Sequence, residues 1–570
     1  MSRQPSISRA RRMLLTGLML SGFVLLAARS AQLQLVDHEF LQGQADARHL
    51  RVVEVPAHRG MMTDRNGEPL AISTPVQSVW ANPKELVAAP ADLRGLARLL
   101  KMKPEQLQRL LGQRKSREFV YLRRHLSPDL ADQVMALGIP GLYLQQEYRR
   151  YYPAGEVAAH LVGFSNVDDQ GQEGLELAFD DWLSGEPGAK RVVKDGRRHI
   201  IENVENIRSA RPGKALVLSI DRRIQYLAYR ELKAAVRQHR ARSGSMVVLD
   251  NRTGEVLAMV NQPAFNPNNR KRLKADKMRN RALTDVFEPG STMKPFVIAA
   301  ALESGDYRPA SRIDTSPGLV QVGVHTIRDK HDYGRLDLTG VLRKSSNVGA
   351  SKIALALEPE DFWTGLSDAG FGVVTESGFP GEASGYLADF HRWRDIERAT
   401  LAYGYGLSVT GMQLAQAYSV LANDGYRVPI TLLKRDADSE LERQAAFSPM
   451  VARAVRKMME SVVAADGTAP LAAVNGYRVA GKTGTAHKSE AGGYAEKRYL
   501  SVFAGMAPAS DPRLVAVVVI NEPSNGEYYG GKVAAPVFSR VMAGALRLLN
   551  IPPDAVSLLH TQRTGTEGPA

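Results

Sequence analysis

A serine and a lysine three residues apart are the first side chains in this sequence whose spacing suggests covalent chemistry. They are Ser291 and Lys294 in the segment FEPGSTMKPF. Pro295 is tolerated only in a first helical turn, so a helix must begin within a few residues of Ser291. Residues three apart share one helical face, which brings the hydroxyl close to the amine. A lysine whose pKa is lowered by burial or by another cation can then take the proton of a serine nucleophile.

Two further motifs supply groups that a serine and a lysine lack. LRKSSNVGASKIA contains Ser345 and Asn347, and VAGKTGTA places Lys482 on a predicted strand. Each motif alone has a structural explanation, because Ser-x-x-Lys and Ser-x-Asn occur at capped helix starts and Lys-Thr-Gly-Thr fits an exposed edge strand. Together and in this order they form the set Ser-x-x-Lys, Ser-x-Asn, Lys-Thr-Gly, and a chance match of all three is far less expected than a match of any one.

The elements that must position these motifs are strands at both ends of one domain. SGSMVVLD and EVLAMV, joined by the turn NRTG, predict a hairpin, and YRVAGKTGTA, LSVFAGMAPA and RLVAVVVIN predict three later strands. KALVLSI is another strand candidate, residues 222–240 have helical periodicity, and the residues between the two groups of strands are mostly helical. We therefore predict an α+β domain over residues 213–552, with an antiparallel sheet covered by helices.

The N-terminus predicts export. Arginines at positions 3, 9, 11 and 12 precede the uncharged apolar run Met13–Ala28. The run is shorter than the roughly 20 residues that cross a bilayer, but the helical pattern continues beyond it. We predict a cytoplasmic basic tail over residues 1–12 and a single transmembrane anchor with its stalk over residues 13–36. A signal peptide cleaved near Ala-Arg-Ser is the alternative, and both interpretations export the remaining chain.

Composition excludes several classes of function. The net charge of +14 comes from Lys and Arg that are interspersed with Asp and Glu, rather than gathered into a nucleic-acid-binding stripe. The chain has no cysteine, and its 12 histidines lack the spacing of metal ligands. We therefore predict no nucleic-acid partner, no metal and no cofactor.

Residues 51–212 have a different sequence pattern. They contain short β-like stretches, tight turns such as TDRNG and helical segments around residues 93–136. We place a domain boundary near Pro212. Arg59 and Glu176, in this first module, have structural interpretations as turn or salt-bridge residues that need no catalysis. The tail 553–570 is predicted to be disordered.

The chain resembles the class B penicillin-binding proteins, most closely the division type known as FtsI and especially its pseudomonad form. HRGMMTDRNGEPLAISTPV and the stretch from YYPAGEV to GQEGLELAFD are similar to the β-rich, elongated pedestal (dimerisation-type) module of that family. NRALTDVFEPGSTMKPF, SSNVGASKIA, GYRVAGKTGTA and YYGGKVAAPVFSRVM are similar to its penicillin-binding, β-lactamase-like transpeptidase domain. The resemblance covers nearly the whole chain.

That resemblance implies a peptidoglycan D,D-transpeptidase that cross-links stem peptides during septal cell-wall synthesis. Ser291 would attack the penultimate D-alanine of a pentapeptide stem, and Lys294 would be the general base. Ser345 would relay protons, Asn347 would orient Lys294, and Lys482 would help to keep Lys294 neutral. The implied substrate-binding residues are Thr483, Gly484, Thr485, Tyr403, Tyr405 and Tyr529. Strict strand alternation puts Lys482 on the opposite face from Thr483 and Thr485, so its role requires twisting or end-on access at an edge.

The implied partners are pentapeptide stems of nascent strands derived from lipid II, β-lactam antibiotics, a membrane glycan polymerase of the FtsW type and other divisome proteins. The implied location is the inner membrane, with the catalytic domain in the periplasm. Two alternatives share the three motifs. One is a serine β-lactamase or D,D-carboxypeptidase, and the other is a β-lactam sensor or divisome scaffold with an acylatable domain that does not transpeptidate.

Overall fold

This computed structural model describes residues 9–36, 50–86, 90–194, 200–271, 273–436, 438–490 and 493–555. Most of the predicted disordered tail, from residue 556 onward, and residues 1–8 of the predicted basic tail lie outside the described residues. The chain divides into two compact units that interleave in the sequence. Unit 1 comprises Met1–His58, Pro75–Tyr148 and Gly185–Gly213, and unit 2 comprises Arg59–Thr74, Arg149–Ser184 and Lys214–Ala570. All three motifs belong to unit 2.

The N-terminal apolar run forms the helix α1 (Arg9–Ala31), which continues into the π-helical turn η1 (Gln32–Val36). Within the described residues, this 28-residue stretch is the one helix long and apolar enough to cross a membrane. At the α-helical rise it measures about 42 Å, more than the roughly 30 Å of a hydrocarbon core. Its apolar side chains are exposed, as is Leu18 at 71%. An anchored protein is consistent with both observations.

Unit 1 contains two sheets. The strands β1 (Leu50–Val55), β8 (Gly188–Lys194) and β9 (Ile200–Arg208) form an antiparallel sheet in the order β1-β8-β9. The C-terminal part of β3 (Pro69–Ala81) pairs with β4 (Val120–Leu126), and β3 also pairs with β5 (Leu142–Tyr151). A separate core forms around that sheet, from residues of its strands and of three helices, α3 (Pro90–Leu99), α4 (Pro104–Gly112) and α5 (Pro128–Met135).

In unit 2, a buried group of charges joins short elements from the N-terminal half of the chain. Glu176 accepts hydrogen bonds from Arg59 Nε at 2.8 Å and from Arg150 Nε at 2.6 Å, and all three side chains are at most 2% exposed. The structural interpretation of Arg59 and Glu176 is confirmed. The short elements are β2 (Met62–Thr63), η2 (Gly155–Val157), α6 (Ala159–Val162), β6 (Phe164–Ser165), β7 (Gly171–Glu173), α7 (Gly174–Ala178), α8 (Asp180–Leu183) and β10 (Leu216–Val217).

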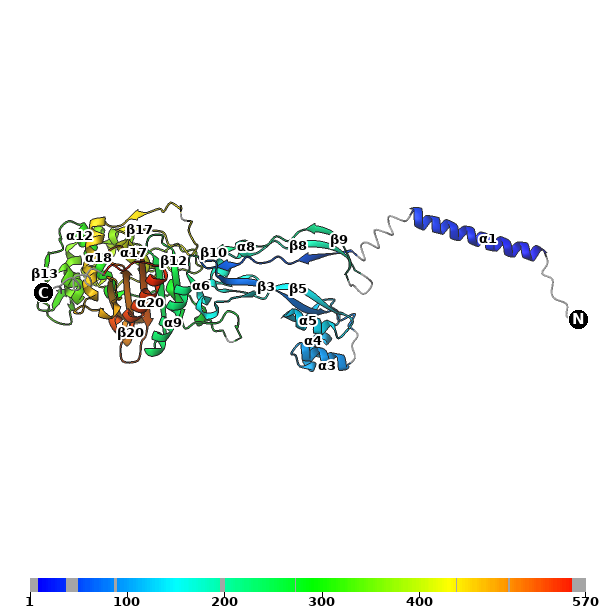
Figure 1. Cartoon of the computed structure of the whole chain (residues 1–570), viewed down its shortest axis with the longest axis horizontal. Helices are drawn as coiled ribbons and strands as arrows, with labels where there is room; N and C mark the ends of the chain where they lie inside the picture. The colour runs from blue at the N-terminus through cyan, green and yellow to red at the C-terminus, as the bar shows by residue number, and fades with distance from the viewer. Residues whose placement is uncertain are drawn as a thin grey trace, which may run out of the picture. The chain divides into compact units, whose positions relative to one another are not determined.

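The predicted antiparallel sheet is the centre of unit 2. Its strands, β11 (Ser243–Asp250), β12 (Val256–Gln262), β19 (Ala480–Glu490), β20 (Gly493–Ala507) and β21 (Leu514–Asn521), follow the order β12-β11-β21-β20-β19. All residues of β11 and β12 are buried, as expected when helices cover both faces. The helices α9 (Arg222–Gln238) and α20 (Ala535–Leu548) pack on each other and on the sheet, and α17 (Gly411–Ala422) packs on β11, β20 and β21 (Figure 1).

The other elements of unit 2 include the helices that carry the first two motifs, α12 (Lys294–Glu303), α13 (Leu338–Lys344) and α14 (Asn347–Ala356), with α18 (Pro449–Val463) beside them. The remaining helices are α10 (Ala275–Met278), α11 (Arg281–Thr284), η3 (Gly290–Met293), α15 (Pro359–Asp368), η4 (Phe390–Arg392), α16 (Asp395–Leu401), η5 (Pro470–Ala472) and α19 (Gly530–Val533). The remaining strands are β13 (Arg312–Asp314), β14 (Leu319–Val322), β15 (His325–Arg328), β16 (Arg335–Asp337), β17 (Tyr426–Arg427) and β18 (Gln444–Ala445).

One predicted strand is much shorter than the sequence suggested. Of KALVLSI, only Leu216 and Val217 form a strand, β10, and it pairs in parallel with β2 rather than joining the central sheet. Its apolar residues Leu216, Leu218 and Ile220 are buried in the main core of unit 2 without a long ladder. Apolar alternation therefore marked burial here but not strand pairing.

Candidate active site

Ser291 lies at a backbone turn that leads into a helix. Gly290 has φ +60°, a conformation that a residue with a side chain rarely adopts, and the 3₁₀ turn η3 then runs from Gly290 to Met293. The helix α12 follows from Lys294, with Pro295 in its first turn, which confirms the predicted helix start. Gly290 N–H also donates to Gly404 O at 3.1 Å, so the turn is held against the chain segment that carries Tyr403 and Tyr405.

Lys294 is completely buried, and its amine lies at the centre of the site. Its Nζ lies 3.0 Å from Ser291 Oγ, 2.6 Å from the carbonyl oxygen of Ser345 and 2.8 Å from Asn347 Oδ1. A fourth contact, to Ser345 Oγ, is 3.2 Å long. The first two motifs are thus brought together by one side chain.

Ser345 joins α13 to α14 in the left-handed conformation, with φ +56° and ψ +42°. That conformation is costly for a residue with a side chain and persists only where its surroundings impose it. Asp329 holds the three residues that follow Ser345, because its carboxylate accepts from Ser346 Oγ at 2.5 Å, from Asn347 N–H at 2.5 Å and from Val348 N–H at 3.1 Å. The carboxylate also lies at the N-terminus of α14, where the helix dipole favours negative charge.

The third motif lies on β19, the edge strand of the central sheet. Lys482 is completely buried, and its Nζ donates to Ser345 Oγ at 3.0 Å, Thr483 O at 3.1 Å and Thr483 Oγ1 at 3.3 Å. The long lysine side chain turns back toward its own neighbour, so strand alternation does not keep its amine away from Thr483. Thr485 Oγ1 accepts from Gly530 N–H at 3.0 Å.

Gly484 permits a close approach between β19 and the turn that carries Ser291. A Cβ atom at position 484 would lie 2.7 Å from Pro289 O and 3.0 Å from the Thr292 methyl group. Real Cβ atoms almost never come that near to a backbone oxygen. Glycine at this position therefore sets the separation between Ser291 and the Lys-Thr-Gly strand.

The electrostatics of the site favour a neutral Lys294. Burial lowers the pKa of Lys294 well below its ordinary value, the charge of Lys482 lowers it further, and Asp329 opposes both effects. Burial also lowers the pKa of Lys482, to about 7. Desolvation disfavours the charged form of an amine, and a second amine nearby adds like-charge repulsion.

The hydrogen-bond partners of a neutral Lys294 determine where its lone pair points. A neutral amine has two N–H donors and one lone pair. The Ser345 carbonyl and Asn347 Oδ1 are acceptors only, so they take both N–H groups. The lone pair is left for a hydroxyl, and Ser291 Oγ lies within the 2.6–3.2 Å reach of a general base. The arrangement can therefore take a proton from Ser291.

The predicted tyrosines form two aromatic groups. Tyr403 and Tyr405 contact each other edge to face with ring centroids 5.6 Å apart, and Tyr405 contacts Tyr494 at 5.4 Å. Tyr529 belongs to a second group, in which its ring lies 4.5 Å from that of Tyr528. The amine of Lys330 lies 4.5 Å above the Tyr529 ring, and Tyr529 is 40% exposed.

Sequence reasoning missed several side chains that support the site. Asp329 follows no motif, and only its place next to β15 brings it to the start of α14. Glu288 precedes the Ser291 turn and accepts from Gly406 N–H at 3.0 Å and from Tyr494 Oη at 3.1 Å. Thr468 shares a 3.1 Å hydrogen bond with Thr483. None of these residues has a local pattern that distinguishes it from an ordinary loop residue. In the part of the chain that the structure describes, no group of three or more His, Cys, Asp or Glu side chains could hold a metal ion.

Comparison with known proteins identifies the family. Residues 244–543 match the penicillin-binding protein transpeptidase domain, and residues 54–218 match the penicillin-binding protein dimerisation domain. The chain belongs to the class B penicillin-binding proteins. The resemblance inferred from the motifs is thereby confirmed.

Relatives of this penicillin-binding protein cover nearly its whole length. It is 46% identical over 528 residues to a probable peptidoglycan D,D-transpeptidase, PbpC, of Pseudomonas aeruginosa, with 93% of each chain covered. It is 46% identical over 549 residues to the peptidoglycan D,D-transpeptidase FtsI of Escherichia coli K12, with 95% of this chain and 92% of that chain covered. The structure of a peptidoglycan synthetase from Bifidobacterium adolescentis matches with a TM-score of 0.70 at 26% identity, covering 89% of this chain and 98% of that chain.

The predicted α+β fold is therefore confirmed, with an N-terminal apolar helix, a dimerisation module and a transpeptidase domain. The transpeptidase domain and the named relatives also support the prediction of a serine acyl-transferring enzyme.

Proposed function

We propose that this class B penicillin-binding protein is a peptidoglycan D,D-transpeptidase that cross-links stem peptides during septal wall synthesis, and that Ser291 is its nucleophile. The observation that carries the assignment of Ser291 is the environment of Lys294 Nζ. Its two N–H groups are taken by carbonyl oxygens, so its lone pair faces Ser291 Oγ at 3.0 Å. A neutral, buried base in contact with a serine hydroxyl is what acyl transfer requires.

In the first half-reaction, Ser291 Oγ attacks the carbonyl of the penultimate D-alanine as its proton passes to Lys294 Nζ. Backbone N–H groups of Ser291 and Thr485 stabilise the oxyanion of the tetrahedral intermediate. The bond to the terminal D-alanine then breaks, and its amine leaves with a proton relayed through Ser345 Oγ, which lies 3.2 Å from Lys294 Nζ and 3.0 Å from Lys482 Nζ. The stem is left as an ester on Ser291.

In the second half-reaction, an amine from a neighbouring stem attacks the ester and Ser291 recovers its proton. Asn347 holds Lys294 in place through both steps. Lys482 supplies positive potential for the carboxylate of the donor stem, and the hydroxyls of Thr483 and Thr485 hydrogen-bond it. The substrate lies along β19 where Gly484 permits close approach, and Tyr403, Tyr405 and Tyr529 line the cleft. β-Lactams acylate Ser291 because they imitate D-alanyl-D-alanine.

We also propose where the protein lies in the cell and with which proteins it works. Residues 1–12 stay in the cytoplasm, the apolar part of α1 that follows them crosses the inner membrane once, and the catalytic domain is periplasmic, because arginines flank the cytoplasmic end of the apolar run. The domains are 13–36 for anchor and stalk, 51–212 for the pedestal, 213–552 for the transpeptidase and 553–570 for the tail. The donor strands derive from lipid II, and a membrane glycan polymerase of the FtsW type supplies them together with other divisome proteins.

The decisive experiment labels the exported part of the protein with a fluorescent penicillin and compares wild type with Ser291→Ala. A long-lived adduct on wild type that is absent from the variant is expected. No adduct on wild type would reject the site, and rapid release would indicate a β-lactamase. Cross-linking of nascent peptidoglycan, measured with a polymerase partner present, then separates a transpeptidase from an acylatable sensor or scaffold.

A further inference from the structure

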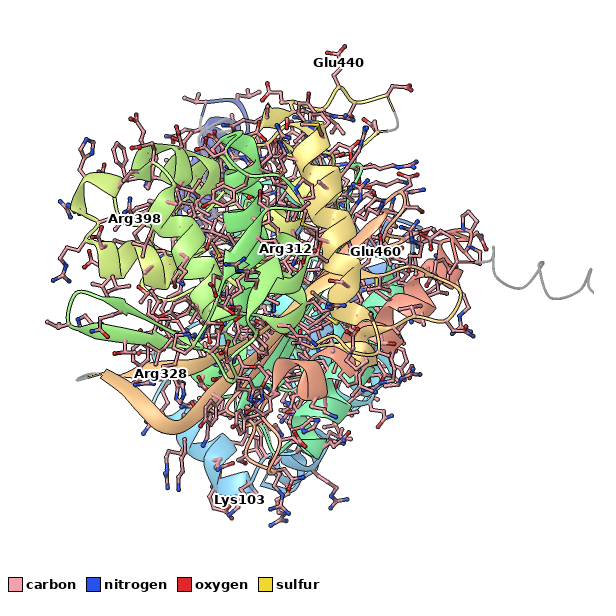
Figure 2. The ribbon with its side chains drawn as sticks, turned by 90° about the vertical axis from the view of Figure 1, so that its left-hand side faces the viewer. Lys103, Arg312, Arg328, Arg398, Glu440 and Glu460 are labelled. Atoms are coloured by element: carbon pink, nitrogen blue, oxygen red, sulfur yellow. The ribbon has the colours of Figure 1, made fainter. Side chains whose placement is uncertain are left out.

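The segment that follows α18 connects the second and third motifs. In Figure 2, α18 is the yellow helix that carries Glu460 near its C-terminal end. The helix ends at Val463, and Asp466 lies in the loop beyond it. Asp466 Oδ2 lies 3.1 Å from Arg343 Nη1 and 4.0 Å from Lys344 Nζ, which directly precede Ser345. Two residues further on, Thr468 contacts the Lys-Thr-Gly strand. One short loop therefore touches both motifs.

Thr468 has a fixed position beside Thr483. Its hydroxyl lies 3.1 Å from Thr483 Oγ1. Its carbonyl is held against Gly531, where an added Cβ would lie only 2.1 Å from Thr468 O. The same Cβ would lie 3.4 Å from the Thr483 methyl group, so Gly531 lies where the chain approaches both threonines closely.

The hydrogen-bonding capacity of Thr483 gives this contact a direction. A threonine hydroxyl has one proton and two lone pairs. The amine of Lys482, 3.3 Å away, is a donor when charged and fills one lone pair. The Thr468 hydroxyl fills the second lone pair when it donates. The single proton of Thr483 is then directed away from both donors and is free for a third group.

We propose that Thr468 is a positioning residue for recognition of the donor-stem carboxylate. It orients the Thr483 hydroxyl so that its proton points at the carboxylate, and it strengthens that donor, because a hydroxyl that accepts hydrogen bonds becomes a better donor. Thr468 acts through Thr483 and does not touch the reacting atoms. The inference rests on the proposed function, which assigns carboxylate binding to Thr483.

The test compares a β-lactam that carries a carboxylate with its uncharged methyl ester. Second-order acylation rates are measured with benzylpenicillin and with benzylpenicillin methyl ester, for wild type, Thr468→Val and Thr468→Ser in the full-length protein. Valine keeps the shape and removes the hydroxyl, and serine keeps the hydroxyl. For Thr468→Val, the rate with benzylpenicillin should fall about threefold to tenfold relative to the rate with the ester, which is what one neutral hydrogen bond is worth. Thr468→Ser should restore the wild-type ratio.

A structural role for Thr468 would lower both rates together and leave their ratio unchanged, and that result would overturn the proposal. An unchanged rate with benzylpenicillin would overturn it as well. Asp466→Asn provides a matched control, because Asp466 belongs to the same loop but faces Arg343, and its ratio should equal that of wild type. If Thr468→Val does not fold, Thr468→Ala gives the same comparison. Failure of wild type to be acylated at all would instead reject the proposed function.

Discussion

The mutual influence of the two buried lysines gives the sharpest prediction. Lys294 and Lys482 both contact Ser345 Oγ, at 3.2 and 3.0 Å. Their amines therefore lie within about 6 Å of each other, and two unit charges at that distance repel by about 3 kcal/mol at an effective dielectric constant of about 20. That energy corresponds to about two pKa units.

Lys482→Gln removes the repulsion, so the pKa of Lys294 should rise. Acylation needs neutral Lys294, so it proceeds above the pKa of Lys294 and is lost as pH falls through it. With a raised pKa, that loss should occur at higher pH. The measurement is the second-order rate of acylation by benzylpenicillin as a function of pH, and the observable is the midpoint of the acid limb.

In the proposed mechanism Lys482 also serves the substrate carboxylate, so the height of the profile should fall in the same variant. Thr485→Val separates the two effects, because it removes a carboxylate contact without removing a charge. Its profile should be lower, with an unchanged midpoint. An acid limb that stays in place in Lys482→Gln, or moves to lower pH, would show that Lys482 does not keep Lys294 neutral.

Three other changes have outcomes that follow from single contacts. Asp329→Asn removes the one charge that raises the pKa of Lys294, so the acid limb of acylation should move to lower pH, and the free energy of unfolding should fall by about 1–2 kcal/mol. Gly484→Ala should displace the Ser291 turn, at a cost of about 1–3 kcal/mol, and slow acylation with little change in circular dichroism. Glu176→Gln should destabilise unit 2 by about 3–5 kcal/mol in chemical denaturation, because it takes the shared carboxylate from two buried arginines and leaves Arg59 with Asp180 alone. Unchanged denaturation would show that Arg59 and Arg150 find other partners.

Local sequence rules were sufficient to predict the elements that carry the motifs. Pro295 fixed the start of a helix near Ser291 because proline is compatible only with a first turn. The strands β11, β12, β20 and β21 were predicted from apolar runs bounded by turn residues, whereas β19 is largely polar and β20 begins well before its apolar run. The KALVLSI segment shows the limit of that signal, since a run of buried residues need not form a ladder.

The geometry within the site was not predictable in the same way. The residues that follow the left-handed Ser345 are held by Asp329, which precedes α13 and belongs to no motif. The direction of Lys482 depends on the flexibility of four methylene groups, which alternation along a strand does not describe. Thr468 reaches Thr483 only because α18 ends beside β19. These are contacts between elements, and a single sequence contains no local pattern for them.

The burial that lowers the pKa of Lys294 also weakens the fold. A buried lysine with a lowered pKa makes folding less favourable at any pH at which the unfolded chain would hold the proton, because folding must then either bury the charge or release the proton. Lys482, with a pKa of about 7 in the folded protein, contributes this penalty fully below pH 7 and loses it between pH 7 and roughly 10.4. No requirement of packing explains two amines in one core, because apolar side chains would fill the same space without that cost. The pair is understandable only if the neutral amine of Lys294 is needed where Ser291 reacts.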